Sequence, residues 1–184
     1  MSGRPVIGWV DKDLNPLSKL TYSGSADGSA SAVIADSESA HVIIGITNNF
    51  TKGTAATEAV QDANECQLRI TSTTGTTDIP VVKEGWIYGK CLTDAAQSDF
   101  TQLGLVGAPN GDDSNPTEVL LNVTAGDASA AQTIKGTAND GADATTGFNV
   151  AKIELYAKPL SSTEATGGVQ QFRTTLIYSY GATA

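Results

Sequence analysis

Apolar and polar residues alternate with a period of two in several short segments of the chain, which predicts β-strands with one buried face. The clearest segment is 151–158, in which Ile153 and Leu155 alternate with Lys152 and Glu154. Because residues of one parity are apolar throughout, we expect one face of this strand to point into a core and the other to contact water.

A second alternating segment, 171–180, follows the turn-forming stretch PLSSTEATGG. Phe172, Leu176 and Tyr178 fall on one face of this strand, and Arg173 falls on the other. The two strands are close in sequence and are joined by turn residues, so we expect them to pair as a long antiparallel hairpin.

Shorter segments show the same strand pattern between clusters of Gly, Ser, Thr, Asn and Asp, which are typical turn residues. These segments are residues 4–10, 17–22, 39–47, 66–71, 85–92 and 117–123. The first two of them predict an N-terminal hairpin around residues 11–16.

Evidence for helices is thin. Residues 54–65 could form a short helix or a turn, and residues 93–103 are a weaker helix candidate. Neither segment has the apolar stripe of an amphipathic helix. The polar stretches 109–116 and 136–147 predict long surface loops.

Seven or more strands separated by turns predict an all-β fold, an antiparallel β-sandwich with long surface loops. A length of 184 residues fits one domain, residues 1–184, that buries its own core without a metal or a disulfide. Within it, residues 1–22 are an N-terminal hairpin or a docking segment.

Four apolar side chains in this N-terminal segment are candidate docking residues: Val6, Ile7, Trp9 and Val10. A terminal strand of this kind either completes its own sheet or adds to the edge of a neighbouring chain. We favour completion of its own sheet for the strand itself, and docking for part of the segment.

The composition argues against several classes of partner. The chain has 11 basic and 20 acidic residues, for a net charge of -9, and its Lys and Arg residues are dispersed. Such a surface repels phosphate backbones and anionic lipid, so we expect neither nucleic acid nor a membrane as partner. The N-terminus lacks the pattern of a secretory signal, which indicates synthesis in a cytoplasm.

Candidate catalytic chemistry is sparse. His41 is the single histidine, and no acid or nucleophile motif lies beside it in the sequence, so a structural or solvent-facing imidazole is expected. No nucleophile-elbow, phosphate-binding or dinucleotide-binding motif is present. Cys66 and Cys91 have no nearby zinc ligands, and we expect each to be a small buried side chain on a strand. We therefore expect a protein that is not an enzyme and has no cofactor.

Two binding chemistries stay open. Residues 11–15, 110–115 and 139–143 concentrate carboxylates and amides, which calcium favours and which ordinary turns also use. The aromatic residues could instead form a platform for sugars, although core and cross-strand packing is the simpler interpretation. They are Trp9, Trp86, Tyr22, Tyr88, Tyr156, Tyr178 and Tyr180, among which we expect Tyr156 to be the most exposed.

Taken together, the segments ITNNF, ECQLRITST, VVKEGWIYGKC and VAKIELYAKP…QQFRTTLIYSYGA resemble the immunoglobulin-like proteins among virion structural components of tailed bacteriophages. The resemblance covers most of the chain from about residue 17 onward and consists chiefly of strand alternations with characteristic ends. The insertion between Leu103 and Phe148 departs from a minimal domain and leaves the strand order open there.

The resemblance implies an accessory virion role, such as capsid decoration, a head fibre or a tail or baseplate ornament, and it carries over no catalytic residues. The implied partners are other virion proteins, such as major capsid or tail proteins, and further copies of the chain in a homo-oligomer. The implied location is the virion, after synthesis in the host cytoplasm. The alternatives are a carbohydrate-binding β-sandwich module and a calcium-dependent adhesive or filament subunit.

Overall fold

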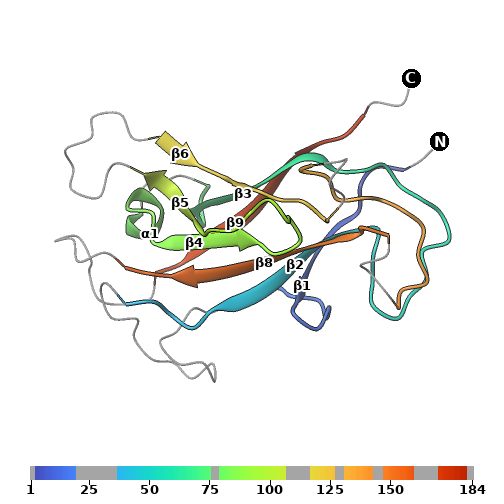
Figure 1. Ribbon diagram of the computed structural model, residues 1–184, viewed down its shortest axis with the longest axis horizontal. Helices are drawn as coiled ribbons and strands as arrows, with labels where there is room; N and C mark the ends of the chain where they lie inside the picture. Colours follow the sequence, from blue (N-terminus) through green and yellow to red (C-terminus); the bar gives the residue numbers. More distant parts are fainter. Residues whose placement is uncertain are drawn as a thin grey trace.

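The structure, a computed structural model, describes residues 3–19, 37–75, 79–106, 117–126, 131–142, 147–159 and 170–181. These residues form an all-β fold of two sheets and one short helix (Figure 1). The strands are β1 (Ile7–Asp11), β2 (Val42–Asn48), β3 (Asn64–Ser72), β4 (Ile87–Cys91), β5 (Thr101–Val106), β6 (Thr117–Val119), β7 (Leu121–Asn122), β8 (Val150–Ala157) and β9 (Phe172–Ser179), and the helix is α1 (Pro80–Lys83).

The larger sheet has six strands in the order β1-β2-β8-β4-β5-β6, and every neighbouring pair is antiparallel. At its centre, β8 has Ala151, Ile153 and Leu155 buried, and they alternate with the half-buried Lys152 and Glu154. This is the pattern of the sequence prediction for 151–158, which is confirmed as a strand.

The smaller sheet has the order β7-β3-β9 and is also antiparallel. Its central strand β3 carries Leu68 and Ile70 on its buried face. A register shift between Asn64 and Gln67 includes Glu65, whose φ of 53° marks a bulge. From Gln67 to Ser72 the pairing with β9 is continuous.

The chain changes sheets between β6 and β7. Thr117–Val119 pairs with β5 in the larger sheet, whereas Leu121–Asn122 pairs with β3 in the smaller one. The predicted single strand 117–123 is therefore two short strands on either side of Leu120. This crossover connects β6, an edge strand of the larger sheet, to β7, an edge strand of the smaller sheet.

One main apolar core lies between the sheets. Its largest fully buried side chains are Ile46, Leu68, Ile70, Val82, Ile87, Leu103, Leu121, Val123, Ile134, Ile153 and Leu155. Burial of each such side chain contributes about 1.5–3 kcal/mol. The all-β, antiparallel prediction is confirmed, and two sheets around a shared core agree with a β-sandwich.

The predicted hairpin between 151–158 and 171–180 is wrong. Both segments are strands, but β8 pairs with β2 and β4, and β9 pairs with β3 in the other sheet. Since both edges of β8 are occupied by partners, none is left for β9. The two strands therefore belong to different sheets.

The two helix candidates are also wrong. In the first, 54–65, Thr54, Ala56, Val60 and Ala63 form isolated β-bridges in extended chain. The second, 93–103, contains turns and then the beginning of β5.

The only helix of the described chain is α1, which no periodicity predicted. Pro80 stands at its start, where a missing N–H costs nothing, and Val81 and Val82 are buried. No helix of the described residues is long and apolar enough to cross a membrane.

Candidate interaction surface

Strand β9 has one open edge. It pairs with β3 along one side, and no described residue pairs with the other. Its sequence, FRTTLIYS, contains no proline, lysine or acidic residue, and Arg173 is its single charge. Exposed strand edges without such protection readily accept another strand.

The side chains of β9 leave both faces partly accessible. Ile177 on one face is 41% exposed. Tyr180, just beyond the strand and in phase with the other face, is 42% exposed. On the other face Phe172, Leu176 and Tyr178 pack against the core but are only half-buried. From Thr174 to Tyr178, the edge of β9 therefore combines apolar side chains with backbone that no described strand pairs with.

The backbone groups that point to this edge follow from the bonds of Cys66. Its N–H donates to the Gln132 carbonyl and its own carbonyl accepts from the Val123 N–H, so both point away from β9. Backbone groups alternate in direction along a strand, which turns those of Gln67, Arg69 and Thr71 toward β9.

Their partners on β9 are Ile177, Thr175 and Arg173, and these use their backbone groups toward β3. The N–H and carbonyl groups of Thr174, Leu176 and Tyr178 consequently point to the open edge.

The other sheet edges are shielded. Beside β1, the Leu17 N–H donates to the Trp9 carbonyl at 2.8 Å and the Asp11 N–H donates to the Asn15 carbonyl at 2.9 Å. Residues 15–17 thus occupy the outer side of β1 at these positions.

Strands β6 and β7, with three and two residues, are too short to offer a long edge. The Gln97 side chain also donates to the Asn122 carbonyl of β7 at 2.9 Å.

The four candidate docking residues lie on or beside β1. Val6 is 59% exposed, Ile7 and Trp9 are half-buried and pack against the core, and Val10 is buried. Strand β1 pairs with β2 over its whole length, so the strand completes its own sheet, as favoured from the sequence.

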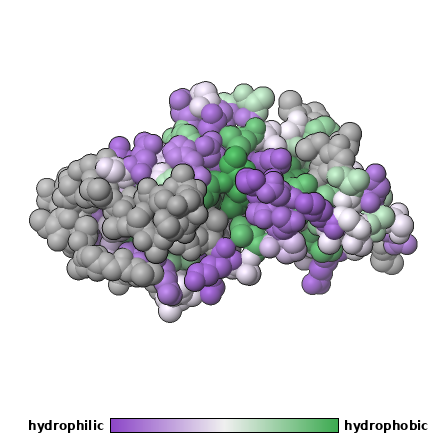
Figure 2. Space-filling model, turned by 90° about the horizontal axis from the view of Figure 1, so that it is seen from below, coloured by the Kyte–Doolittle hydropathy of each residue, from purple (hydrophilic) through white to green (hydrophobic). Residues whose placement is uncertain are grey.

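The lower side of the molecule, where β1 and β2 lie in Figure 1, carries a narrow hydrophobic strip between hydrophilic residues (Figure 2). Val6 and Ile43 are the exposed large hydrophobic residues in and beside these two strands.

His41 lies at one end of three stacked rings on the outer face of the larger sheet, here called the aromatic column: His41, Tyr156 and Tyr88. The His41 and Tyr156 ring centroids are 4.6 Å apart with planes at 11°, and those of Tyr156 and Tyr88 are 5.0 Å apart at 2°. Phe100 meets the rings of both Tyr156 and His41 edge-on.

The aromatic column corrects the prediction that Tyr156 is the most exposed tyrosine. Tyr156 is 7% exposed, because His41 and Tyr88 cover its two faces and Phe100 covers an edge. Burial, followed by the charge of Glu38, raises the pKa of both Tyr156 and Tyr88. A ring with both faces covered cannot stack on a sugar, so Tyr156 belongs to cross-strand packing.

The other aromatic candidates are dispersed. Trp86 is buried and donates its indole N–H to Glu84 at 2.7 Å, whereas Trp9 packs against the core from β1. Tyr178 and Tyr180 lie together at the end of β9, with centroids 6.2 Å apart. Tyr22 lies outside the described residues.

The fold gives His41 acidic partners that its sequence neighbourhood did not indicate. Its Nδ1 lies 2.8 Å from Oε1 of Glu154, a residue 113 positions away, and its Nε2 lies 3.5 Å from Oε2 of Glu38. Within the described ranges neither ring nitrogen bonds a hydroxyl or a thiol. The arrangement holds the ring in place, as expected for a structural imidazole.

The calcium candidate at residues 11–15 is occupied by turn contacts. Asp11 accepts the N–H groups of Asp13 and Asn15, both at 2.9 Å, and the hydrogen bonds from Asn15 are the main reason that its pKa is lowered. Lys52 donates to the Asp13 carbonyl at 2.7 Å and to Asn15 Oδ1 at 3.3 Å. An ammonium group thus already contacts two oxygens of this loop.

The remaining calcium candidates are described only in part. Residues 110–115 and residue 143 lie outside the described chain. Asn139 and Asp140 accept the N–H groups two positions onward, at Gly141 and Ala142, which is the geometry of Asx turns. No group of three His, Cys, Asp or Glu side chains among the described residues could hold a metal ion.

Cys66 and Cys91 are free and buried, on β3 and β4 respectively, which confirms their predicted burial on strands. Burial raises the pKa of the Cys66 thiol to about 12. Each thiol also contacts a backbone carbonyl, that of Ala63 for Cys66 and that of Thr124 for Cys91. Both therefore behave as small core side chains.

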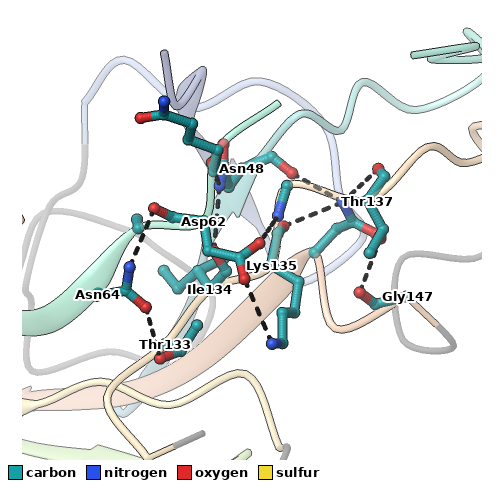
Figure 3. A network of polar contacts seen from close by, with 12 residues as sticks. Asn48, Asp62, Asn64, Thr133, Ile134, Lys135, Thr137 and Gly147 are labelled. Atoms are coloured by element: carbon teal, nitrogen blue, oxygen red, sulfur yellow. Dashed lines mark hydrogen bonds and ion pairs between the residues drawn. The ribbon is translucent and has the colours of Figure 1, made fainter. Parts of the chain in front are cut away.

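A buried polar network connects the chain around residue 62 with residues 133–149 (Figure 3). The amide of Asn48 donates to the Gln61 and Ile134 carbonyls, and its oxygen accepts the Val6 N–H. Asn149, also fully buried, donates to the carbonyls of Asn48, Lys135 and Thr137.

Asp62 completes this network by accepting the Gly136 N–H at 2.9 Å and the Lys135 ammonium at 3.3 Å. Gly136 is buried, so the predicted surface loop 136–147 begins as packed chain. The side-chain amides of Asn48 and Asn149 donate their hydrogen bonds to backbone carbonyls, which indicates a structural role.

Comparisons with protein-family models, curated proteins and solved structures find no match. The open edge of β9 is the feature that reasoning from the sequence missed. Its signal was present in the printed sequence, as a long apolar strand without proline, lysine or acidic residues.

Proposed function

We propose that this protein is a non-enzymatic structural component of a tailed-bacteriophage virion, a capsid-decoration or tail-accessory protein that acts through protein-protein contacts. Its partners would be major capsid or tail proteins and further copies of itself, and its sandwich would belong to the immunoglobulin-like group. The resemblance of the strand segments supplies the virion setting.

The observation that carries the proposal is the contrast between the edges of the two sheets. Three of the four sheet edges in the described chain are shielded or very short, whereas the edge of β9 has no described partner strand from Thr174 to Tyr178 and carries the exposed Ile177. Natural β-proteins normally protect such an edge, so its retention is understandable if another chain covers it. Val6, 59% exposed at the N-terminal segment, is a second apolar contact point.

The two alternative functions have weaker support. A sugar platform would need an accessible aromatic face, and Tyr156 has both faces covered. A calcium-dependent subunit would need free oxygen ligands, and Lys52 contacts those of residues 13 and 15.

The test is sedimentation of the purified full chain with phage particles that lack it. We expect saturable binding with many copies per particle, since a symmetric lattice repeats each contact. Glycan binding that is lost in Tyr88→Ala, or a melting temperature that rises with calcium, together with no particle binding, would replace the proposal by the corresponding alternative.

A further inference from the structure

The open edge of β9 has the properties of a self-complementary surface. Its accessible backbone groups belong to Thr174, Leu176 and Tyr178, as the alternation from Cys66 requires. An antiparallel partner strand must present backbone groups of the same spacing, and a second β9 related by a two-fold axis does so by symmetry.

We infer that two copies of the chain associate through β9, antiparallel and centred on Leu176, to form a continuous sheet of the order β7-β3-β9-β9-β3-β7. This inference rests on the proposed function, which assigns the β9 edge to contact with another chain, and it names that chain as a second copy.

The side chains suit this register on both faces. Leu176 meets Leu176 of the second copy, and Thr174 meets Tyr178. On the opposite face, Thr175 meets Ile177, so that the 41% exposed Ile177 gains the methyl group of Thr175 as a neighbour. Cross-strand pairs between side chains of this kind stabilise an antiparallel sheet.

The charges of β9 do not oppose a second copy. Two chains with a net charge of -9 repel each other in general, yet β9 contains no acidic residue. Its one charge, Arg173, would lie opposite Ser179 of the second copy. The two arginines would therefore stand at opposite ends of the interface, roughly 20 Å apart along six residues of strand.

The first test measures the mass of the full chain by sedimentation equilibrium. We expect a dimer of the 18.9 kDa chain. Ile177→Lys should raise the dimer dissociation constant at least about tenfold, since it adds a charge at the edge. Ile43→Lys is the matched control, because Ile43 is 37% exposed on the other sheet and should leave the dimer intact.

A proline pair tests the direction of the backbone groups. Thr174→Pro removes an N–H that points to the open edge, so it should weaken the dimer and leave the fold largely stable. Thr175→Pro removes an N–H that points to β3, so it should lower the melting temperature strongly. Equal destabilisation of the fold by both would contradict the assignment of these groups.

Disulfide trapping tests the register. Leu176→Cys should crosslink rapidly to its own copy under mild oxidation, and Ser179→Cys should not, because its copies are distant. The native Cys66 and Cys91 are buried and should stay unreacted.

The outcomes separate the two proposals. A chain that stays monomeric, or a dimer that survives both Ile177→Lys and Thr174→Pro, overturns the β9 dimer. A monomer that still binds phage particles overturns the dimer alone, and a β9 dimer that binds no particle overturns the proposed function alone.

Discussion

Arg69 and Glu118 form a two-point ion pair between the sheets, with Nε to Oε1 at 2.6 Å and Nη2 to Oε2 at 3.0 Å. Arg69 lies on β3 of the smaller sheet and Glu118 on β6 of the larger one. The pair therefore fixes the short edge strand β6 just before the chain changes sheets at Leu120.

We predict that Glu118→Gln lowers the free energy of unfolding by about 1 kcal/mol, as for a well-aligned but partly exposed pair. The effect should shrink in high salt, because both side chains are about one third exposed. Urea unfolding at two salt concentrations measures it, with Asp99→Asn as the exposed control. Equal losses in the two variants would show that the pair contributes nothing specific.

The buried amide of Asn149 should be far more important for stability. In Asn149→Ala, the carbonyls of Asn48, Lys135 and Thr137 lose the side-chain amide donor that they share in the wild-type protein. We predict a loss of about 2–4 kcal/mol in the free energy of unfolding. Asn122→Ala, at an exposed position with a side-chain contact to Gln67, is the control and should cost less than about 1 kcal/mol.

The aromatic column predicts an alkaline loss of stability. Tyr88 and Tyr156 have a raised pKa in the folded chain, chiefly through burial, so the unfolded chain releases these protons at lower pH. The contribution of these two tyrosines to the free energy of unfolding is complete below the ordinary tyrosine pKa of 10.0. It is lost as the pH rises through their pKa in the folded chain.

Absorbance of tyrosinate against pH measures this ionisation, and Tyr88 and Tyr156 should titrate above the ordinary tyrosine pKa. Tyr156→Phe should remove the ionisation of Tyr156 from the titration curve at high pH. A titration in which no tyrosine of the folded protein ionises above the ordinary tyrosine pKa would contradict the burial of the column.

The thiol of Cys66 should be inert in the folded protein. Its pKa of about 12 leaves almost no thiolate at pH 8, and the side chain is buried. A thiol reagent should react with it only at the rate of unfolding. Leu92→Cys, at a position that is 40% exposed, provides the reactive comparison. Rapid labelling of Cys66 in native protein would show that the core opens locally at β3.

Local alternation was sufficient to predict most strands and the burial of both cysteines, because each depends on the neighbours along one strand. It could not predict that β8 pairs with β2 and β4, because pairing depends on contacts between distant segments. The failed helix at 54–65 has the same origin, since its extended chain is held by residues 134 and 139.

For the candidate sites too, local contacts could be predicted and contacts between distant segments could not. The turn at Asp11 could be read from its spacing, whereas the burial of Tyr156 requires His41, Tyr88 and Phe100, which come from three other parts of the chain. The hydrogen bond between His41 and Glu154 likewise joins residues 113 positions apart.

The most direct test of a virion role is the protein composition of phage particles purified by density gradient from a culture that carries the gene. Quantitative peptide mass spectrometry should find this chain in the particle band, in a fixed ratio to the major capsid or tail protein. Particles from a culture with the gene deleted should lack it and regain it when the purified chain is added. Absence of the chain from the particle band, with all of it in the soluble fraction, would contradict the account.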